Sequence, residues 1–174
     1  MKKVFMMLMA ALLVAACATL TPEQKAARDA AIKEGVKSAV ASQKFKINVT
    51  SVIPMRAANR SVSGPFIKLD STTVECYLPY AGRDDIPHMK TRGEMRMTSK
   101  IEIRGEVRDY VMGIDPADER AVVSFTASDL GVDYKFTITI ENTGSAKIHV
   151  DPDKRDYIDY EGYVVIRNNK NELN

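Results

Sequence analysis

The sequence predicts an α+β domain, mainly β, in which one N-terminal helix is followed by about eight antiparallel strands. The first observation is a single helical stretch, residues 22–43, which contains one glycine and no proline after its first position. The second is that the spacing of apolar residues changes at residue 44 from a helical period to alternation. The third is that no further helical pattern separates the alternating segments, so parallel strands with helical crossovers are not expected. We therefore expect a meander that forms a partly open barrel or a sandwich.

The start of the helix carries a recognisable capping sequence. Thr21 is a favourable N-cap residue, Pro22 suits the first helical position, and Gln24 completes a capping box with Thr21. The apolar stripe begins only at Ile32 and continues to Val40. We therefore expect the first turns to be solvated and the last turns to pack on the β domain.

Alternation in the following segments predicts a sheet with one apolar and one polar face. It is clearest in residues 94–108, where the even positions are charged or polar and most odd positions are apolar. Other alternating segments are 45–49, 121–127, 134–140 and 146–150. The last two are joined by Asn-Thr-Gly-Ser at 142–145, which predicts a hairpin turn.

Two stretches are predicted to lie outside the strands. Residues 82–93 (GRDDIPHMKTRG) are charged and contain proline, which favours a loop long enough to form a lid or rim. Residues 151–162 (DPDKRDYIDYEG) are acidic and tyrosine-rich. Their acidic positions do not match a calcium-binding loop, because Asp156 stands where glycine is needed and Gly162 where glutamate is needed.

Residues 1–16 have the organisation of an export signal. Lys2 and Lys3 precede an apolar run at 4–13 that is too short to span a bilayer. The following Val-Ala-Ala-Cys resembles a bacterial lipobox, in which Cys17 receives a diacylglycerol before cleavage in front of it. We therefore expect the membrane itself to be a partner through lipid on Cys17.

The predicted processing defines three parts of the chain. They are a signal peptide at 1–16, a lipid-anchored helical stalk at 17–43 and an antiparallel β domain at 44–174. The residue after Cys17 is alanine rather than aspartate, and by resemblance to lipoprotein sorting rules this favours the outer membrane. No acidic run follows Cys17, so the periplasmic face is expected rather than the cell surface.

Composition narrows the range of functions. Loss of Lys2 and Lys3 reduces Lys+Arg from 25 to 23, which equals the 23 Asp+Glu residues of the chain. A neutral mature chain offers little electrostatic basis for binding nucleic acid. Cys76 is the one cysteine left after lipidation, and its place in an alternating segment predicts a buried, inert thiol rather than a reactive one.

Catalytic and metal-binding motifs are absent from the sequence, so neither an enzyme nor a cofactor is expected. His88 and His149 lie far apart, and His149 falls on the polar side of its strand. The remaining candidates are Tyr77, Tyr80 and Arg83, in Tyr-Leu-Pro-Tyr-Ala-Gly-Arg at the end of a predicted strand. These residues can line a polar-rimmed pocket. Alternatively, the rings belong to the core with hydrogen-bonded hydroxyls, and the arginine is ion-paired.

Several segments resemble a known family when they are taken in order. They are the lipobox signal, the alanine-rich helix, KFKINVTSVIPM, YLPYAGR and YKFTITIENTGSAKIHV. Together they resemble a lipoprotein family of Bacteroidetes known as domain of unknown function 4251. The resemblance covers nearly all of the mature chain. It implies export and a shared fold, and it implies no catalytic residue because the family has no established activity.

Two functions follow as hypotheses. The first is a non-enzymatic, lipid-anchored periplasmic domain that binds a small apolar or amphipathic ligand, or a glycan, in a partly open barrel. Its basis is the apolar face of the sheet, together with Met95, Met97, Tyr80 and Arg83. The alternative is an interaction or scaffold module that holds an envelope protein by an exposed sheet edge or by the polar face.

Overall fold

A computed structural model describes residues 21–82, 99–115, 120–153 and 155–166. The predicted signal peptide, Cys17, Arg83, His88, Met95 and Met97 lie outside the described residues. The chain divides into two compact units, residues 1–31 and residues 32–174. The single helix among the described residues runs through the boundary between them.

Helix α2 spans Pro22–Ala41. The predicted capping box is present: the Thr21 amide donates to the Gln24 side-chain oxygen at 3.1 Å, and the Gln24 amide donates to the Thr21 hydroxyl at 3.3 Å. Within the second unit, Val36 and Val40 are buried in the core of the sheet. No helix in the described part of the chain is both long and apolar enough to cross a membrane.

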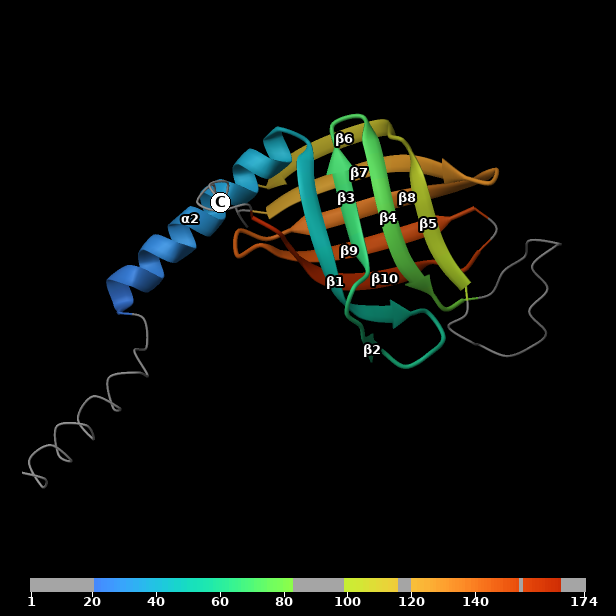
Figure 1. Cartoon of the computed structure of the whole chain (residues 1–174), viewed down its shortest axis with the longest axis horizontal. Helices are drawn as coiled ribbons and strands as arrows, with labels where there is room; N and C mark the ends of the chain where they lie inside the picture. Colours follow the sequence, from blue (N-terminus) through green and yellow to red (C-terminus); the bar gives the residue numbers. More distant parts are fainter. Residues whose placement is uncertain (1–20, 83–98, 116–119, 154, 167–174) are drawn as a thin grey trace, which may run out of the picture. The chain divides into compact units, whose positions relative to one another are not determined.

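Ten strands, all in antiparallel pairs, form one sheet among the described residues (Figure 1). The strands are β1 (Lys44–Pro54), β2 (Arg60–Ser61), β3 (Phe66–Asp70), β4 (Thr73–Tyr80), β5 (Ser99–Glu106), β6 (Arg108–Asp115), β7 (Arg120–Asp129), β8 (Val132–Ile140), β9 (Ser145–Pro152) and β10 (Ile158–Val164). Their order is β5-β4-β3-β1-β10-β9-β8-β7-β6, and β2 pairs with β1.

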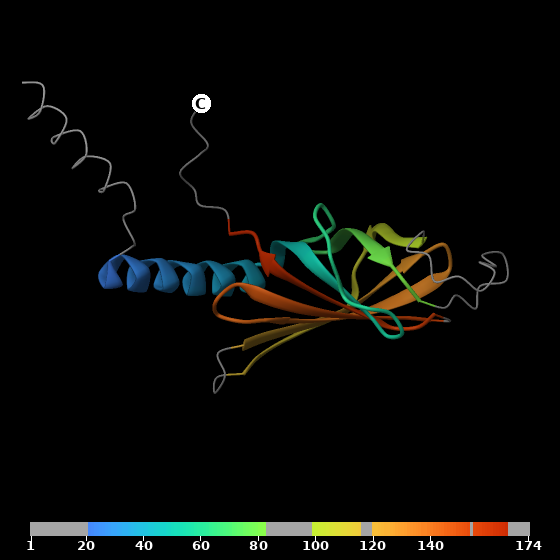
Figure 2. The same cartoon turned by 90° about the horizontal axis from the view of Figure 1, so that it is seen from below.

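The sheet consists of two meanders joined by the first and last long strands. β1, β3, β4 and β5 form one meander, β6 to β10 form the other, and β1 pairs with β10 between them. The sheet folds over on itself, so that β3–β5 lie across β7–β9 (Figures 1 and 2). It is open between β5 and β6 and therefore does not close into a barrel. The predicted mainly-β fold is confirmed, with ten strands rather than about eight.

The prediction that residues 151–162 lie outside the strands is wrong. β9 continues to Pro152, and β10 begins at Ile158. Ile158 and Tyr160 face the core, whereas Asp159 and Glu161 lie on the outer face. The segment 151–162 contains many acidic residues and only these two large inward residues in β10. Two inward residues are too few to make the strand alternation prominent in the sequence.

Inward-facing side chains from both meanders form one apolar cluster. Phe125 and Phe136 stack within it, with ring centroids 4.8 Å apart. Two buried tyrosines connect strands that are not neighbours: the Tyr80 hydroxyl donates to the Asp156 carbonyl at 2.8 Å, and the Tyr160 hydroxyl donates to the Pro79 carbonyl at 2.9 Å. These two hydrogen bonds link the end of β4 to β10 and to the segment just before it, across the interior.

Cys76 lies in the same cluster and is 1% exposed. Desolvation by burial raises the pKa of its thiol to about 12. The thiolate is the reactive form, so this side chain is a small apolar core residue at neutral pH. The predicted burial of Cys76 is confirmed.

Candidate functional site

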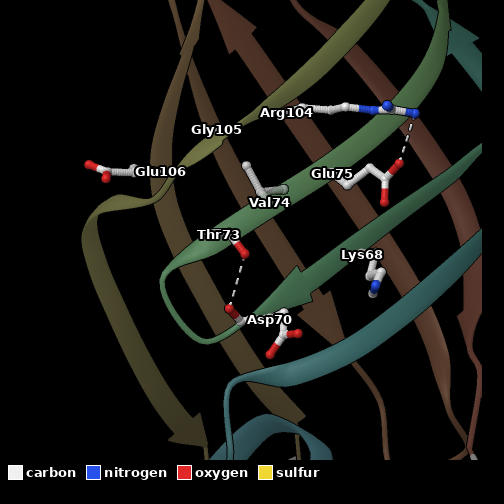
Figure 3. Close-up of a pocket in the computed structure, with 8 residues that line it drawn as sticks. All are labelled: Lys68, Asp70, Thr73, Val74, Glu75, Arg104, Gly105 and Glu106. Atoms are coloured by element: carbon white, nitrogen blue, oxygen red, sulfur yellow. Dashed lines mark hydrogen bonds and ion pairs between the residues drawn. The ribbon is translucent and has the colours of Figure 1, made fainter.

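An open groove lies on the outer face of β3, β4 and β5 (Figure 3). Its volume is about 490 Å³. The lining residues are Lys68, Asp70, Thr73, Val74, Glu75, Arg104, Gly105 and Glu106. Strand alternation explains this composition, because the charged members occupy outward positions while the Val74 side chain is buried.

Strand register arranges the charged side chains of the groove in cross-strand rows. Lys68, Glu75 and Arg104 lie opposite one another on β3, β4 and β5. Arg104 forms an ion pair with Glu75 at 3.1 Å. In the adjacent row, Asp70 pairs with Lys44 at 3.2 Å. The groove therefore offers both positively and negatively charged hydrogen-bonding groups, all close to solvent.

A row of aromatic side chains borders the groove. Register places Tyr163 (β10), Asn48 (β1), Phe66 (β3) and Tyr77 (β4) across four neighbouring strands. Tyr163 and Tyr77 are 49% and 45% exposed, and Phe66 is partly buried. Phe66 and Tyr77 are two positions along their strands from Lys68 and Glu75, which is about 7 Å. The rings and the charged groups thus form one continuous outer surface, which we call the aromatic–charged face.

Two lysines cover rings on this face. Lys46 Nζ lies 4.8 Å from the centroid of Phe66, and Lys100 Nζ lies 5.5 Å from that of Tyr77. Lys100 also pairs with Glu102 on the same strand. Their hydrogen bond raises the pKa of Lys100 and lowers that of Glu102, so both groups are ionised over a wide pH range. Because these side chains are solvated, the pair is readily rearranged by a ligand.

The three candidate residues from the sequence do not form one pocket in the described structure. Tyr77 lies on the aromatic–charged face, whereas Tyr80 is 0% exposed on the inner face. The two are three positions apart on β4, and residues an odd number of positions apart on a strand point to opposite faces. Tyr80 has the core role, with a hydrogen-bonded hydroxyl, and Arg83 lies outside the described residues.

His149 occupies the outer face of β9, as predicted. Its Nδ1 lies 2.6 Å from Asp159 Oδ1, and its ring is tilted against Tyr157. Both members of the histidine–aspartate pair are partly exposed. Across the described residues, no three histidine, cysteine or acidic side chains gather in a way that could hold a metal ion.

Sequence reasoning missed Phe66, Asn48 and Tyr163 as neighbours of Tyr77. Phe66 and Tyr163 are aromatic residues at outward strand positions, where a polar residue is expected, and that deviation was the available signal. Asn48 is polar and gives no such signal. What could not be derived was the strand order that brings residues 48, 66, 77 and 163 into one row.

Comparison with known proteins identifies the fold. A family model described as "Domain of unknown function (DUF4251)" matches residues 27–164. A crystal structure of a DUF4251 family protein from Bacteroides eggerthii DSM 20697 superposes with a TM-score of 0.61 and 16% sequence identity. The superposition covers 80% of this chain and 91% of that one. Comparison with curated proteins finds no significant match.

Proposed function

The chain belongs to the DUF4251 family, and from this premise we propose that it is a non-enzymatic, lipid-anchored envelope protein that binds a glycan. The binding surface is the aromatic–charged face. The observation that carries the proposal is the cross-strand row of Tyr163, Asn48, Phe66 and Tyr77 beside an open charged groove.

The chemistry of this face suits a carbohydrate. A pyranose ring presents a face of C–H groups that packs on an aromatic ring, and hydroxyl groups at its edge that need hydrogen-bond partners. Tyr77 and Phe66 supply the rings, and Lys68, Glu75 and Arg104 supply donors and acceptors alongside them. The groove is open along the sheet, which favours an extended chain of sugars over one enclosed small molecule.

The inner face of the sheet supports an apolar ligand less well. Inward residues from both meanders already bury one another in a single cluster that includes the large rings of Tyr80, Tyr160, Phe125 and Phe136. A ligand on that face would have to displace close-packed side chains, at a cost of several kcal/mol. The outer face requires no such rearrangement.

The glycan proposal is tested by calorimetric titration of the full chain with cello-, xylo-, manno- and chitohexaose. We expect one of these to bind, and Tyr77→Ala with Tyr163→Ala to weaken its binding at least tenfold, about 1.4 kcal/mol. Tyr157→Ala is the matched control, because Tyr157 is also an exposed tyrosine but contacts His149 on another part of the sheet. Binding of none of the four sugars, or equal loss in the control, would contradict the proposal.

The anchoring proposal has its own test. The lipobox resemblance supports lipid attachment at Cys17. The alanine that follows it supports sorting to the outer membrane, and the lack of an acidic run supports the periplasmic face. Changing Cys17→Ala removes the thiol that takes the diacylglycerol, so the chain is expected to leave the membrane fraction. The measurement is membrane fractionation followed by immunodetection. Membrane association that persists in the variant would refute lipid attachment at Cys17.

A further inference from the structure

Most cations of the aromatic–charged face are neutralised by a neighbouring carboxylate. The ion pairs are Lys44 with Asp70, Arg104 with Glu75, and Lys100 with Glu102. Two lysines differ from these: neither Lys46 on β1 nor Lys68 on β3 forms an ion pair with another described residue. In Figure 3 a dashed line joins Glu75 to Arg104, and none reaches Lys68. The face therefore carries two positive charges without a carboxylate partner in the described structure.

The two unpaired lysines are direct neighbours. Strand register places Lys46 opposite Lys68, and both side chains are exposed on the outer face. Directly opposed residues on antiparallel strands have Cβ atoms about 4.5–5.5 Å apart, and like charges in this arrangement destabilise the strand pair. An anion bound between the two ammonium groups would replace this repulsion with two attractions. The site is therefore better suited to a charged ligand group than to a neutral one.

The residues around the two lysines do not supply the missing negative charge. On the β10 side, the Val165 amide donates to the Lys46 carbonyl at 2.7 Å, so an apolar residue lies beside Lys46. On the β4 side, Lys68 faces Glu75, whose carboxylate is already held by an arginine. Glu106 lies two strands from Lys68, at least about 10 Å away (Figure 3). The row across β1, β3, β4 and β5 thus has three positive charges and one negative charge.

One of the lysines is also coupled to the aromatic row. Lys46 Nζ lies 4.8 Å from the centroid of the Phe66 ring, where it is attracted by the π electrons. A sugar that packs on Phe66 must move this ammonium off the ring. A neutral sugar gives the displaced ammonium no charged partner, whereas an acidic sugar does. Lys100 covers Tyr77 in the same way, but it has Glu102 as a partner when it moves.

We propose that the glycan is acidic and that Lys46 and Lys68 form a subsite for its carboxylate or sulfate group, next to the ring of Phe66. This inference rests on the proposed function and names the class of glycan that the aromatic–charged face binds. Lysine ammonium groups act as point charges on flexible stems, so they select for negative charge rather than for a planar group. Arg104, whose planar fork would favour a carboxylate, is engaged by Glu75.

The test compares sugars that differ only in charge. The full chain is titrated by calorimetry with cellohexaose and mannohexaose, each in three forms that carry a hydroxyl, a carboxylate or a sulfate at C6. We expect an acidic form to bind at least tenfold more tightly than its neutral parent. Salt should reduce this gain, because it screens exposed charges. Comparison of the carboxylate with the sulfate identifies which acid group the subsite prefers.

Variants of the protein locate the gain in affinity. Lys46→Gln with Lys68→Gln should abolish the gain of the acidic form and change binding of the neutral parent by less than about twofold. Lys37→Gln with Lys135→Gln is the matched control, because it removes the same net charge at exposed positions on α2 and β8. The control should keep the gain. All four side chains are exposed, so the fold should persist in both variants.

The possible results separate this inference from the proposed function. If none of the neutral or acidic sugars binds, both fail. The inference alone fails if a neutral hexaose binds and neither of its acidic forms binds more tightly. It also fails if the gain survives in the Lys46 and Lys68 variant, or if the control loses it equally. Hexaglutamate carries as many side-chain carboxylates without a sugar ring and should bind at least tenfold more weakly than the acidic hexaose. Equal binding of hexaglutamate would show attraction to any polyanion and would overturn the inference.

Discussion

Tyr80→Ala is expected to destabilise the protein by about 3–5 kcal/mol, the range for removing a large buried ring. Tyr80 is fully buried at the end of β4, and its hydroxyl donates to the Asp156 carbonyl just before β10. The Arg155 guanidinium lies 5.2 Å from the centroid of the same ring. Truncation therefore leaves a cavity and also removes the hydrogen bond that links the end of β4 to the segment before β10 across the interior.

Two further variants divide this effect into its parts. Tyr80→Phe keeps the ring and removes the hydroxyl, so its cost should be about 1–2 kcal/mol, which is one hydrogen bond to a part-buried carbonyl. Tyr77→Ala removes a half-exposed ring from the other face of the same strand and should cost less than about 1 kcal/mol. Urea unfolding followed by circular dichroism measures all three. A larger loss of unfolding free energy for Tyr77→Ala than for Tyr80→Ala would contradict the assignment of Tyr77 to the outer face and Tyr80 to the inner face.

The same two tyrosines show what the sequence could establish about the site. YLPYAGR attracts attention because two tyrosines and an arginine lie close together in the chain. A strand places Tyr77 and Tyr80 on opposite faces, so proximity in sequence separates them in space. The residues that do join Tyr77 lie on three other strands, and Tyr163 is 86 positions away in the sequence. Alternation identifies the face of a residue but not its neighbours, because neighbours depend on strand order.

The fold was more predictable than the site because most of its signals are local in the sequence. A capping box and a 3.6-residue stripe are local, so the helix could be placed within two residues of its ends. Most strands were likewise visible as alternating segments. β10 was not visible as an alternating segment, because three of its positions are acidic or glycine and only a few of its residues face inward. It forms a strand because it pairs with β1 on one side and β9 on the other. Tertiary pairing of this kind overrides weak local preference.

Gly162→Ala tests the pairing of β10 with β1. We expect it to lower the free energy of unfolding by about 3 kcal/mol or more. Gly162 lies in β10 between Val49 of β1 and Ala146 of β9. A Cβ atom at this position would overlap the Asn48 carbonyl oxygen and lie 3.1 Å from the Val49 Cα. Both obstacles are backbone atoms, so no side-chain rotation can relieve the overlap, and β1 and β10 would have to separate. The measurement is the free energy of unfolding in urea.

A second strand glycine provides the control for this prediction. A Cβ added at Gly113, on the edge strand β6, meets no atom within 4 Å. Gly113→Ala should therefore change stability by no more than about 0.5 kcal/mol, even though both substitutions add one methyl group to a strand. Equal effects of the two variants would mean that strand propensity, not backbone contact, decides the outcome. A selective loss at Gly162 would instead show that close approach of β1 and β10 joins the two meanders, and that glycine is needed there because only glycine lets the two backbones come together.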